Sequence, residues 1–266
     1  MTGLSAGATG RLAVLGLGTL VLLPLQWLVV RALPERAGIL PRAFHRLACL
    51  CLGVRSRVRG TPPPPGAGAL IVANHVSWLD ICVLGAERQL AFVAKSEVAG
   101  WPLIGHLARL QHTVFIDRQR RSATAGVAAA MGARIAKGED IVLFAEGTTG
   151  DGTRILPFRS SLLGAAHQAM GDGGTDVTVY PLTITYTGSY GLPGGRIERN
   201  ALAWYGDTEL APHLKYVLGC GKVDVELVWG APIAMGRATS RKDATRLAEA
   251  TVRAARREAV TGRAGE

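Results

Sequence analysis

The sequence has few aromatic residues and few cysteines, and each shortage excludes a class of function. Phe, Trp and Tyr make up 6% of the 266 residues, and no tract interleaves them with Arg or Lys, which argues against single-stranded nucleic-acid binding. Cys49, Cys51, Cys82 and Cys220 do not have the spacing of a zinc site. We therefore expect them to be small buried apolar side chains, and we predict no metal site and no nucleic-acid partner.

A serine-hydrolase motif and internal repeats are also missing. The pentad Gly-x-Ser-x-Gly presents the nucleophile of many hydrolases, and the nearest segment, TGSYG at 187–191, lacks the first glycine. The run of prolines at 62–65 is the one tract of low complexity. A covalent serine mechanism would have to use Ser77, which lies two residues after a histidine.

The chain is instead rich in positive charge and in apolar residues. It has 30 Lys and Arg against 20 Asp and Glu, a net charge of +10 and a pI near 10.0. Hydrophobic residues make up 48%, and the mean hydropathy is +0.22. This composition is apolar for a soluble protein, and the charge favours anionic partners. We therefore expect contact with an anionic membrane surface.

Residues 12–30 contain no charged side chain and are bracketed by Arg11 and Arg31. A run of this length is just long enough to span a bilayer. A signal peptide is the competing interpretation, but RALPER follows where a cleavage site with small residues should be. Pro24 and Gln26 keep an in-plane or re-entrant helix open as well. The excess of Arg after the run predicts that the C-terminal side is cytoplasmic, as at a bacterial-type inner membrane.

The rest of the chain predicts an α/β protein. Residues 39–60 alternate apolar clusters with Arg, which predicts an amphipathic helix with a basic face. TPPPPGAG at 61–68 is typical of a rigid linker followed by a turn. Short apolar runs then alternate with helical patterns, so we expect a mixed sheet covered by helices. The predicted organisation is membrane-anchoring helices at 1–60, a linker at 61–68 and a catalytic domain at 69–266.

The segment NHVSWLD at 74–80 follows the apolar run ALIVA and admits two interpretations. Ser77 and Asp80 resemble a capping box, so the segment can simply start a helix. The same turn would place His75 at the mouth of the sheet, where open α/β folds bind ligands. Asp80 on the first helical turn could then fix the tautomer of His75 and stabilise the imidazolium. His75 could in that case deprotonate a substrate hydroxyl directly.

Two later segments end strands with groups that suit an anionic ligand. VFIDR at 114–118 places Arg118 after a strand, and Arg is well suited to phosphate or carboxylate. FAEGTTGDG at 144–152 leaves a strand into a turn rich in Gly and hydroxyls, which can cradle an anion. Taken alone, the first segment is also typical of a surface arginine, and the second is more typical of a long polar loop.

Together and in this order, Asn-His-x-Ser-x-x-Asp, Phe-Ile-Asp-Arg and Phe-x-Glu-Gly-Thr resemble the glycerolipid acyltransferase family, which includes the 1-acylglycerol-3-phosphate acyltransferases. The mid-strand proline of VYPLTI and the segment KSEVAGWPLIG at 95–105 add to the resemblance, which covers roughly residues 65–235. It implies an enzyme that moves an acyl group from acyl carrier protein or coenzyme A to the hydroxyl of a lysolipid. No metal or further cofactor is implied.

The resemblance also implies roles for individual residues. His75 would be the general base and Asp80 the residue that orients it. Arg118 would hold the acceptor head group together with the turn after Phe144, and Pro181 would lie on the acyl-donor side. The substrate-binding positions implied are Asn74, Ser77, Arg118, Glu146, Gly147, Thr148, Thr149 and Pro181.

The third motif departs from the family pattern Phe-Pro-Glu-Gly-Thr-Arg. Ala145 replaces the proline, and Thr149 stands where the arginine is expected. The extended form EGTTGDGTRILPFRSSL, with AWYGD at 203–207, resembles the branch that acylates lyso-ornithine lipid, whose head group has no phosphate. Lyso-ornithine lipid and 1-acylglycerol-3-phosphate both remain open as acceptors. The alternatives to an acyltransferase are a lipid hydrolase or thioesterase and a non-catalytic lipid-binding protein.

Overall fold

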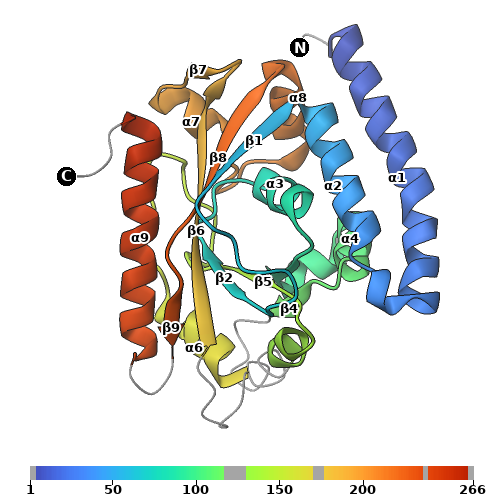
Figure 1. Cartoon of the computed structure of the whole chain (residues 1–266). Helices are drawn as coiled ribbons and strands as arrows, with labels where there is room; N and C mark the ends of the chain where they lie inside the picture. Colours follow the sequence, from blue (N-terminus) through green and yellow to red (C-terminus); the bar gives the residue numbers. More distant parts are fainter. Residues whose placement is uncertain (1–3, 117–129, 170–176, 236–238, 263–266) are drawn as a thin grey trace.

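A mixed sheet runs through the centre of the molecule, with helices on both faces (Figure 1). The computed structural model describes residues 4–116, 130–169, 177–235 and 239–262, and within these ranges nine strands form one sheet. Their order is β1-β8-β6-β2-β5-β3-β4, with β7 and β9 also paired to β6. The strands are β1 (Val54–Arg59), β2 (Leu70–Ala73), β3 (Ala91–Lys95), β4 (Val114–Ile116), β5 (Ile141–Phe144), β6 (Val177–Ser189), β7 (Leu192–Pro193), β8 (Val223–Trp229) and β9 (Ile233–Met235).

The helices alternate with these strands, as the sequence predicts. β2 is parallel to β5 and β6, whereas β6 is antiparallel to β8, so the predicted mixed α/β class is confirmed. The helices are α1 (Ala6–Ala32), α2 (Ile39–Leu52), α3 (Leu79–Glu87), α4 (Ile104–Leu110), α6 (Ser160–Ala169), α7 (Arg196–Leu202), α8 (Leu210–Cys220) and α9 (Arg241–Thr261), with 3-10 turns η1 (Pro34–Arg36) and η2 (Ser96–Gly100).

β2 is the central strand that leads to the candidate site. All four of its residues are fully buried, as expected of a strand in a sheet covered on both faces. Ile71 and Ala73 pack on the side of α2 and α3, whereas Leu70 and Val72 pack on the side of α6 and α9. The two cores hold β2 rigidly, so the turn that follows it starts from a fixed point.

Residues 54–59 differ from the sequence prediction. The amphipathic helix predicted over 39–60 ends at Leu52, where Gly53 takes a left-handed conformation with φ 72°. The next six residues form β1, which pairs in parallel with β8. The helix prediction is wrong there because Val54 and Val58 also fit the two-residue period of a strand, and Gly53 ends the helix. These residues are therefore part of the sheet, although the predicted boundaries place them in the N-terminal segment.

Helix α1 lies beside α2 along one side of the body (Figure 1). The Arg11 guanidinium donates to the carbonyl of Leu218 at 2.7 Å. Near the other end, the buried amide of Gln26 donates to the carbonyls of Ala37 at 2.7 Å and Leu110 at 2.9 Å. Polar contacts thus tie both ends of α1 to the protein, an arrangement that favours a helix lying along the body.

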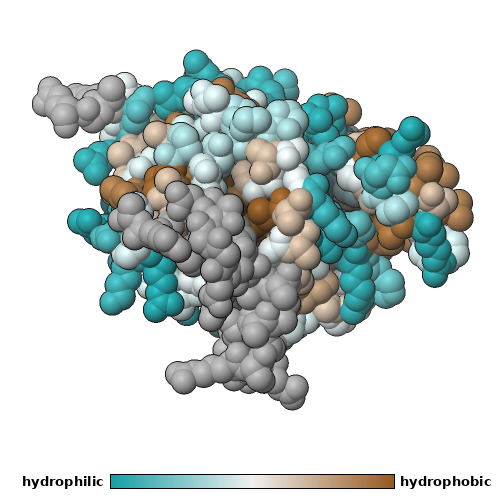
Figure 2. Space-filling model, turned by 60° about the horizontal axis from the view of Figure 1, so that its bottom comes forward, coloured by the Kyte–Doolittle hydropathy of each residue, from teal (hydrophilic) through white to brown (hydrophobic). Residues whose placement is uncertain are grey.

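The outer face of α1 is apolar. Leu17, Leu20 and Leu28 are more than half exposed, and Figure 2 shows hydrophobic surface on the side of the molecule where α1 lies. α1 is long and apolar enough to cross a membrane.

All four cysteines are free thiols; Cys51 is buried and the other three are half-buried.

Candidate active site

The turn between β2 and α3 forms the candidate site. β2 ends at Ala73, next to the end of β5 at Phe144, because these two residues pair in the parallel register. Residues 74–78 then make a short non-helical turn, and α3 begins at Leu79. The site thus lies at the carboxyl end of neighbouring strands, where the sequence places it.

His75 and Asp80 are in contact across this turn. His75 Nδ1 lies 2.8 Å from Asp80 Oδ2. The carboxylate is fully buried, whereas the His75 side chain is 19% exposed. Because a carboxylate only accepts hydrogen bonds, the proton lies on Nδ1 and Nε2 is left as the basic nitrogen. This is the tautomer that a general base needs.

Backbone donors fix the carboxylate, and an aromatic ring supports the imidazole. Asp80 Oδ2 also accepts the N–H groups of Val76 at 2.7 Å and Ser77 at 3.0 Å. The imidazole stacks on the Phe144 ring, with centroids 3.8 Å apart and planes 11° apart. β5 therefore supplies a flat apolar support for a histidine that follows β2.

The predicted role of Ser77 as a helix cap is wrong. Its hydroxyl is fully buried and has no hydrogen-bond partner in the part of the chain that the structure describes. The other half of the predicted capping box is present, since Asp80 accepts the N–H of Ser77. The same burial removes the hydroxyl from any substrate, which disfavours a hydrolase that uses Ser77 as nucleophile.

Asn74 ties β2 to β6 beyond the last pair of the ladder. Its amide nitrogen donates to the carbonyl of Ile184 at 2.9 Å, and its amide oxygen accepts the N–H of Ile184 at 2.8 Å. The side chain is 1% exposed, so the structure gives it a framework role. Its predicted contact with substrate stays a prediction.

Replacing Asn74 by alanine is expected to destabilise the fold by about 2–6 kcal/mol. Both polar groups of Ile184 would be left buried without a partner, and each such group costs about 1–3 kcal/mol. Urea unfolding followed by circular dichroism would measure the loss. Asn200→Ala, which removes contacts at a half-buried position, serves as the control; an equal loss in both variants would contradict the framework role.

Glu146 joins the second motif to the first. Its Oε1 accepts the N–H of His75 at 2.8 Å, and its Oε2 accepts the N–H of Leu156 at 2.7 Å. Burial raises the pKa of this carboxyl to about 7, although the two N–H donors favour the ionised form. Gly150 N–H donates to the carbonyl of His75 at 2.8 Å. The loop after β5 therefore binds the backbone of His75 on both its N–H and its C=O.

The other predicted residues lie at different distances from this centre. Gly147 has φ 74° and turns the chain, and Thr148 and Thr149 follow it at the surface of the same loop. Pro181 is buried in β6 opposite Val72, where the partner of β6 changes from β9 to β8 and no N–H is needed. Its acyl-donor role stays a prediction. Arg118 lies outside the described residues.

Sequence reasoning missed two residues of the site. Phe144 is part of the quoted third motif, but its stacking on His75 depends on the β2–β5 register. The buried phenol of Tyr186 donates to Asp80 Oδ1 at 2.6 Å, and Tyr186 is 106 residues away in sequence. Nothing local marks either contact, because both arise from the pairing of distant strands.

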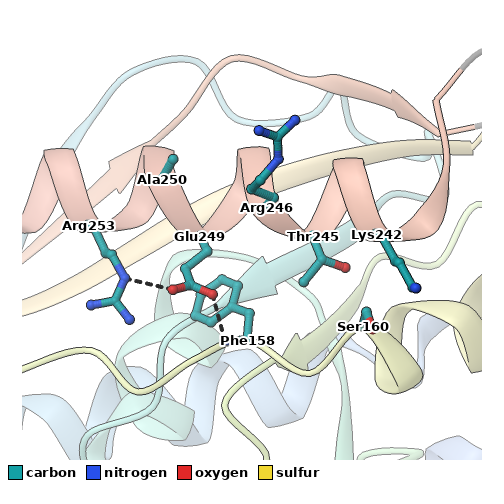
Figure 3. A pocket seen from close by; sticks show the side chains of 8 residues that line it. All are labelled: Phe158, Ser160, Lys242, Thr245, Arg246, Glu249, Ala250 and Arg253. Atoms are coloured by element: carbon teal, nitrogen blue, oxygen red, sulfur yellow. Dashed lines mark hydrogen bonds and ion pairs between the residues drawn. The ribbon is translucent and has the colours of Figure 1, made fainter.

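A groove on the other face of the sheet does not include the pair of His75 and Asp80. It lies between α9 and residues 158–160 (Figure 3). Its volume is about 380 Å³. Glu249 in the groove accepts the N–H of Phe158 at 2.9 Å and pairs with Arg253 at 2.8 Å. Neither His75 nor Asp80 lines it.

Comparison with known proteins finds acyltransferases. Residues 55–185 match the family model described as Acyltransferase. A lyso-ornithine lipid O-acyltransferase of Brucella abortus (strain 2308) is 43% identical over 246 residues, which cover 92% of each chain. One from Rhizobium meliloti (strain 1021) is 44% identical over 250 residues, which cover 92% of this chain and 84% of the relative.

Other relatives share a shorter part of the sequence or share the fold. A 1-acyl-sn-glycerol-3-phosphate acyltransferase of Neisseria gonorrhoeae is 36% identical over 123 residues, 46% of this chain and 48% of the relative. The crystal structure of the acyltransferase PlsC from Thermotoga maritima has a similar fold, with a TM-score of 0.60 and 20% identity over 95% of this chain and all of that one. The protein is thus an acyltransferase, and the chain belongs to the glycerolipid acyltransferase family.

Proposed function

We propose that the protein moves a fatty acyl group from an acyl thioester to the free hydroxyl of lyso-ornithine lipid, with His75 as general base. The observation that carries the mechanism is the 2.8 Å contact between His75 Nδ1 and the buried carboxylate of Asp80. The acceptor is supported by the relatives named lyso-ornithine lipid O-acyltransferase, which align over nearly the whole chain.

The reaction needs no covalent intermediate with the protein. Nε2 of His75 takes the proton of the acceptor hydroxyl while the oxygen attacks the thioester carbonyl. The tetrahedral intermediate then collapses, the carbon–sulfur bond breaks, and the thiolate of coenzyme A or acyl carrier protein leaves. The imidazolium returns its proton to the sulfur. Asp80 stabilises the imidazolium between these two steps.

Thr149 supports an acceptor without phosphate. The family pattern has an arginine at this position, and arginine binds phosphate with paired charged hydrogen bonds. Here a half-exposed threonine lies in the loop whose next residue, Gly150, binds the carbonyl of His75. The arginine that the family pattern places beside the base to bind phosphate is therefore absent from this loop position.

The site of action that we propose is the cytoplasmic face of an anionic membrane. The apolar outer face of α1 would contact the lipid, and the net charge of +10 would attract the protein to anionic head groups. Arg31, Arg36, Arg42 and Arg46 follow the apolar run, which is the charge pattern of a cytoplasmic flank.

Direct assay of the purified full chain tests this function. The protein is incubated with labelled acyl carrier protein or labelled acyl coenzyme A and with either lyso-ornithine lipid or 1-acylglycerol-3-phosphate, and the lipids are extracted and separated. The expected product is labelled two-chain ornithine lipid. Labelled free fatty acid alone would identify a hydrolase, and no labelled product with any donor would identify a non-catalytic lipid-binding protein.

Replacing Thr149 by arginine is expected to shift acceptor preference toward 1-acylglycerol-3-phosphate. A guanidinium at the loop surface would add charged hydrogen bonds to phosphate, and we expect the ratio of kcat/KM for the two acceptors to change about tenfold, which corresponds to about 1.4 kcal/mol. Thr148→Arg adds the same charge at the exposed neighbouring position. An equal change in both variants would show that charge alone, and not position 149, decides the acceptor.

A further inference from the structure

We infer that Tyr186 is a positioning residue for the proposed reaction: its hydroxyl holds the Asp80 carboxylate in the orientation that faces His75. This inference rests on the proposed function, since it concerns the same base. It assigns a purpose to a buried phenol on β6 that lies outside all of the motifs quoted from the sequence.

The contact is short and shielded from water. Tyr186 Oη donates to Asp80 Oδ1 at 2.6 Å. Tyr186 is 2% exposed and Asp80 is fully buried. The two carboxylate oxygens therefore have separate partners: Oδ2 accepts His75 and two backbone N–H groups, while Oδ1 accepts the phenol. With both oxygens held, the carboxylate cannot turn away from the imidazole.

The register of the sheet explains how a residue so distant in sequence arrives there. Asn74 binds both backbone groups of Ile184, so β6 is fixed to the first residue of the turn. Tyr186 is two residues further along β6 and points to the same face as Ile184, into the core that contains α3. The clamp at Asn74 and the contact at Asp80 therefore belong to one assembly.

The titratable groups around Asp80 and Tyr186 leave the phenol as a permanent donor. Burial raises the pKa of Tyr186 well above its usual range. Burial also raises the pKa of the Cys49 thiol on α2 to about 12, and that of the Cys82 thiol on α3 further. His75 and Glu146 also face Asp80. The carboxyl of Glu146 has a pKa of about 7, so it is partly neutral at neutral pH. At neutral pH both thiols and the phenol keep their protons.

Removal of the hydroxyl has two separable consequences. The O–H dipole points its positive end at Oδ1 and offsets part of the negative charge that the imidazole feels. Without it the imidazolium is better stabilised, so protonation of His75 moves to higher pH. The carboxylate also loses its fixed orientation, which lowers kcat. The KM for the acceptor should not change, because a buried phenol does not touch the substrate.

Tyr186→Phe tests the inference, because it keeps the ring and removes only the hydroxyl. We expect kcat to fall about tenfold, KM for the acceptor to stay within about twofold, and the acid limb of the pH–kcat/KM profile to move up by about half a pH unit. NMR titration of the His75 ring should show the same upward shift without any need for turnover. Tyr180→Phe, on the same strand and packed against the same core, should change none of these.

A second comparison separates positioning from a purely structural role. In a His75→Ala background, Tyr186→Phe should leave the residual rate unchanged within about twofold, because there is no base left to position. An equal loss in both backgrounds, or unshifted pH and NMR titrations in the single variant, would overturn the inference. If wild type and the phenylalanine variant both fail to transfer acyl groups, the proposed function is wrong, and the NMR titration still decides whether the phenol tunes the histidine.

Discussion

Replacing His75 by alanine is expected to lower kcat for acyl transfer by about a hundred- to ten-thousand-fold, the usual contribution of a general base. The hydroxyl of the acceptor would then have to lose its proton to water. The Asp80 carboxylate would keep its two backbone donors and the Tyr186 hydroxyl, so the turn should keep its shape. Initial rates with labelled acyl thioester would measure the loss.

A matched control separates chemistry from folding. His106 lies on the exposed side of α4, and His106→Ala should retain the wild-type rate. The melting temperature of His75→Ala should stay close to that of the wild type, apart from the lost stacking on Phe144. A His75→Ala variant with near-normal turnover would remove His75 from the chemistry and with it the proposed mechanism.

The sequence predicted the elements around the base because they are encoded locally. ALIVA is apolar throughout and leads into the turn, and Asp80 falls on the first turn of α3 as its spacing from Ser77 requires. The contact between His75 and Asp80 needs only this strand, this turn and this helix. It was therefore within reach of sequence reasoning, and the distance between the two side chains agrees with it.

The remaining contacts could not be predicted because they depend on strand pairing. Phe144 reaches His75 only because β5 lies beside β2, and Tyr186 reaches Asp80 only because Asn74 fixes the register of β6. Residues 54–59 show the same limit. Their alternation of valine and arginine fits an exposed strand as well as the end of a basic helix, and the choice is made by pairing with β8.

The candidate site therefore combines a local pair with a non-local frame. The pair supplies the base and its carboxylate, and the frame holds the backbone of His75 from two sides through Glu146 and Gly150. The frame explains why a glutamate follows β5 in a buried position, where an ionised side chain is costly. Its carboxylate accepts two N–H groups that face each other across the loop.

The Glu146→Gln variant is expected to lose about ten- to a hundredfold in kcat, because a shift of the base away from its productive geometry reduces the rate by this order. Glutamine has one acceptor oxygen and one NH₂ group, so it can accept the N–H of His75 or that of Leu156, but not both. The NH₂ group of the glutamine then faces the backbone N–H that the side chain cannot accept. This contact between two buried donors costs about 1–3 kcal/mol of stability. Glu249→Gln is the matched control, since Glu249 also accepts a backbone N–H but lies in the groove on the other face of the sheet (Figure 3). It should lose stability without losing activity.

The pH dependence of stability gives an independent measurement of the same carboxyl. Burial raises its pKa from 4.5 to about 7, so between these values the folded protein holds a proton that the unfolded chain has released. The stability that this group contributes is complete below about pH 4.5 and is lost as the pH rises through about 7, by on the order of 3 kcal/mol.

Denaturant unfolding at a series of pH values should show this decline in the wild type and in Glu249→Gln, but not in Glu146→Gln, which cannot ionise. A decline of equal size in the Glu146→Gln variant would show that another group titrates in this window and that Glu146 is ionised throughout.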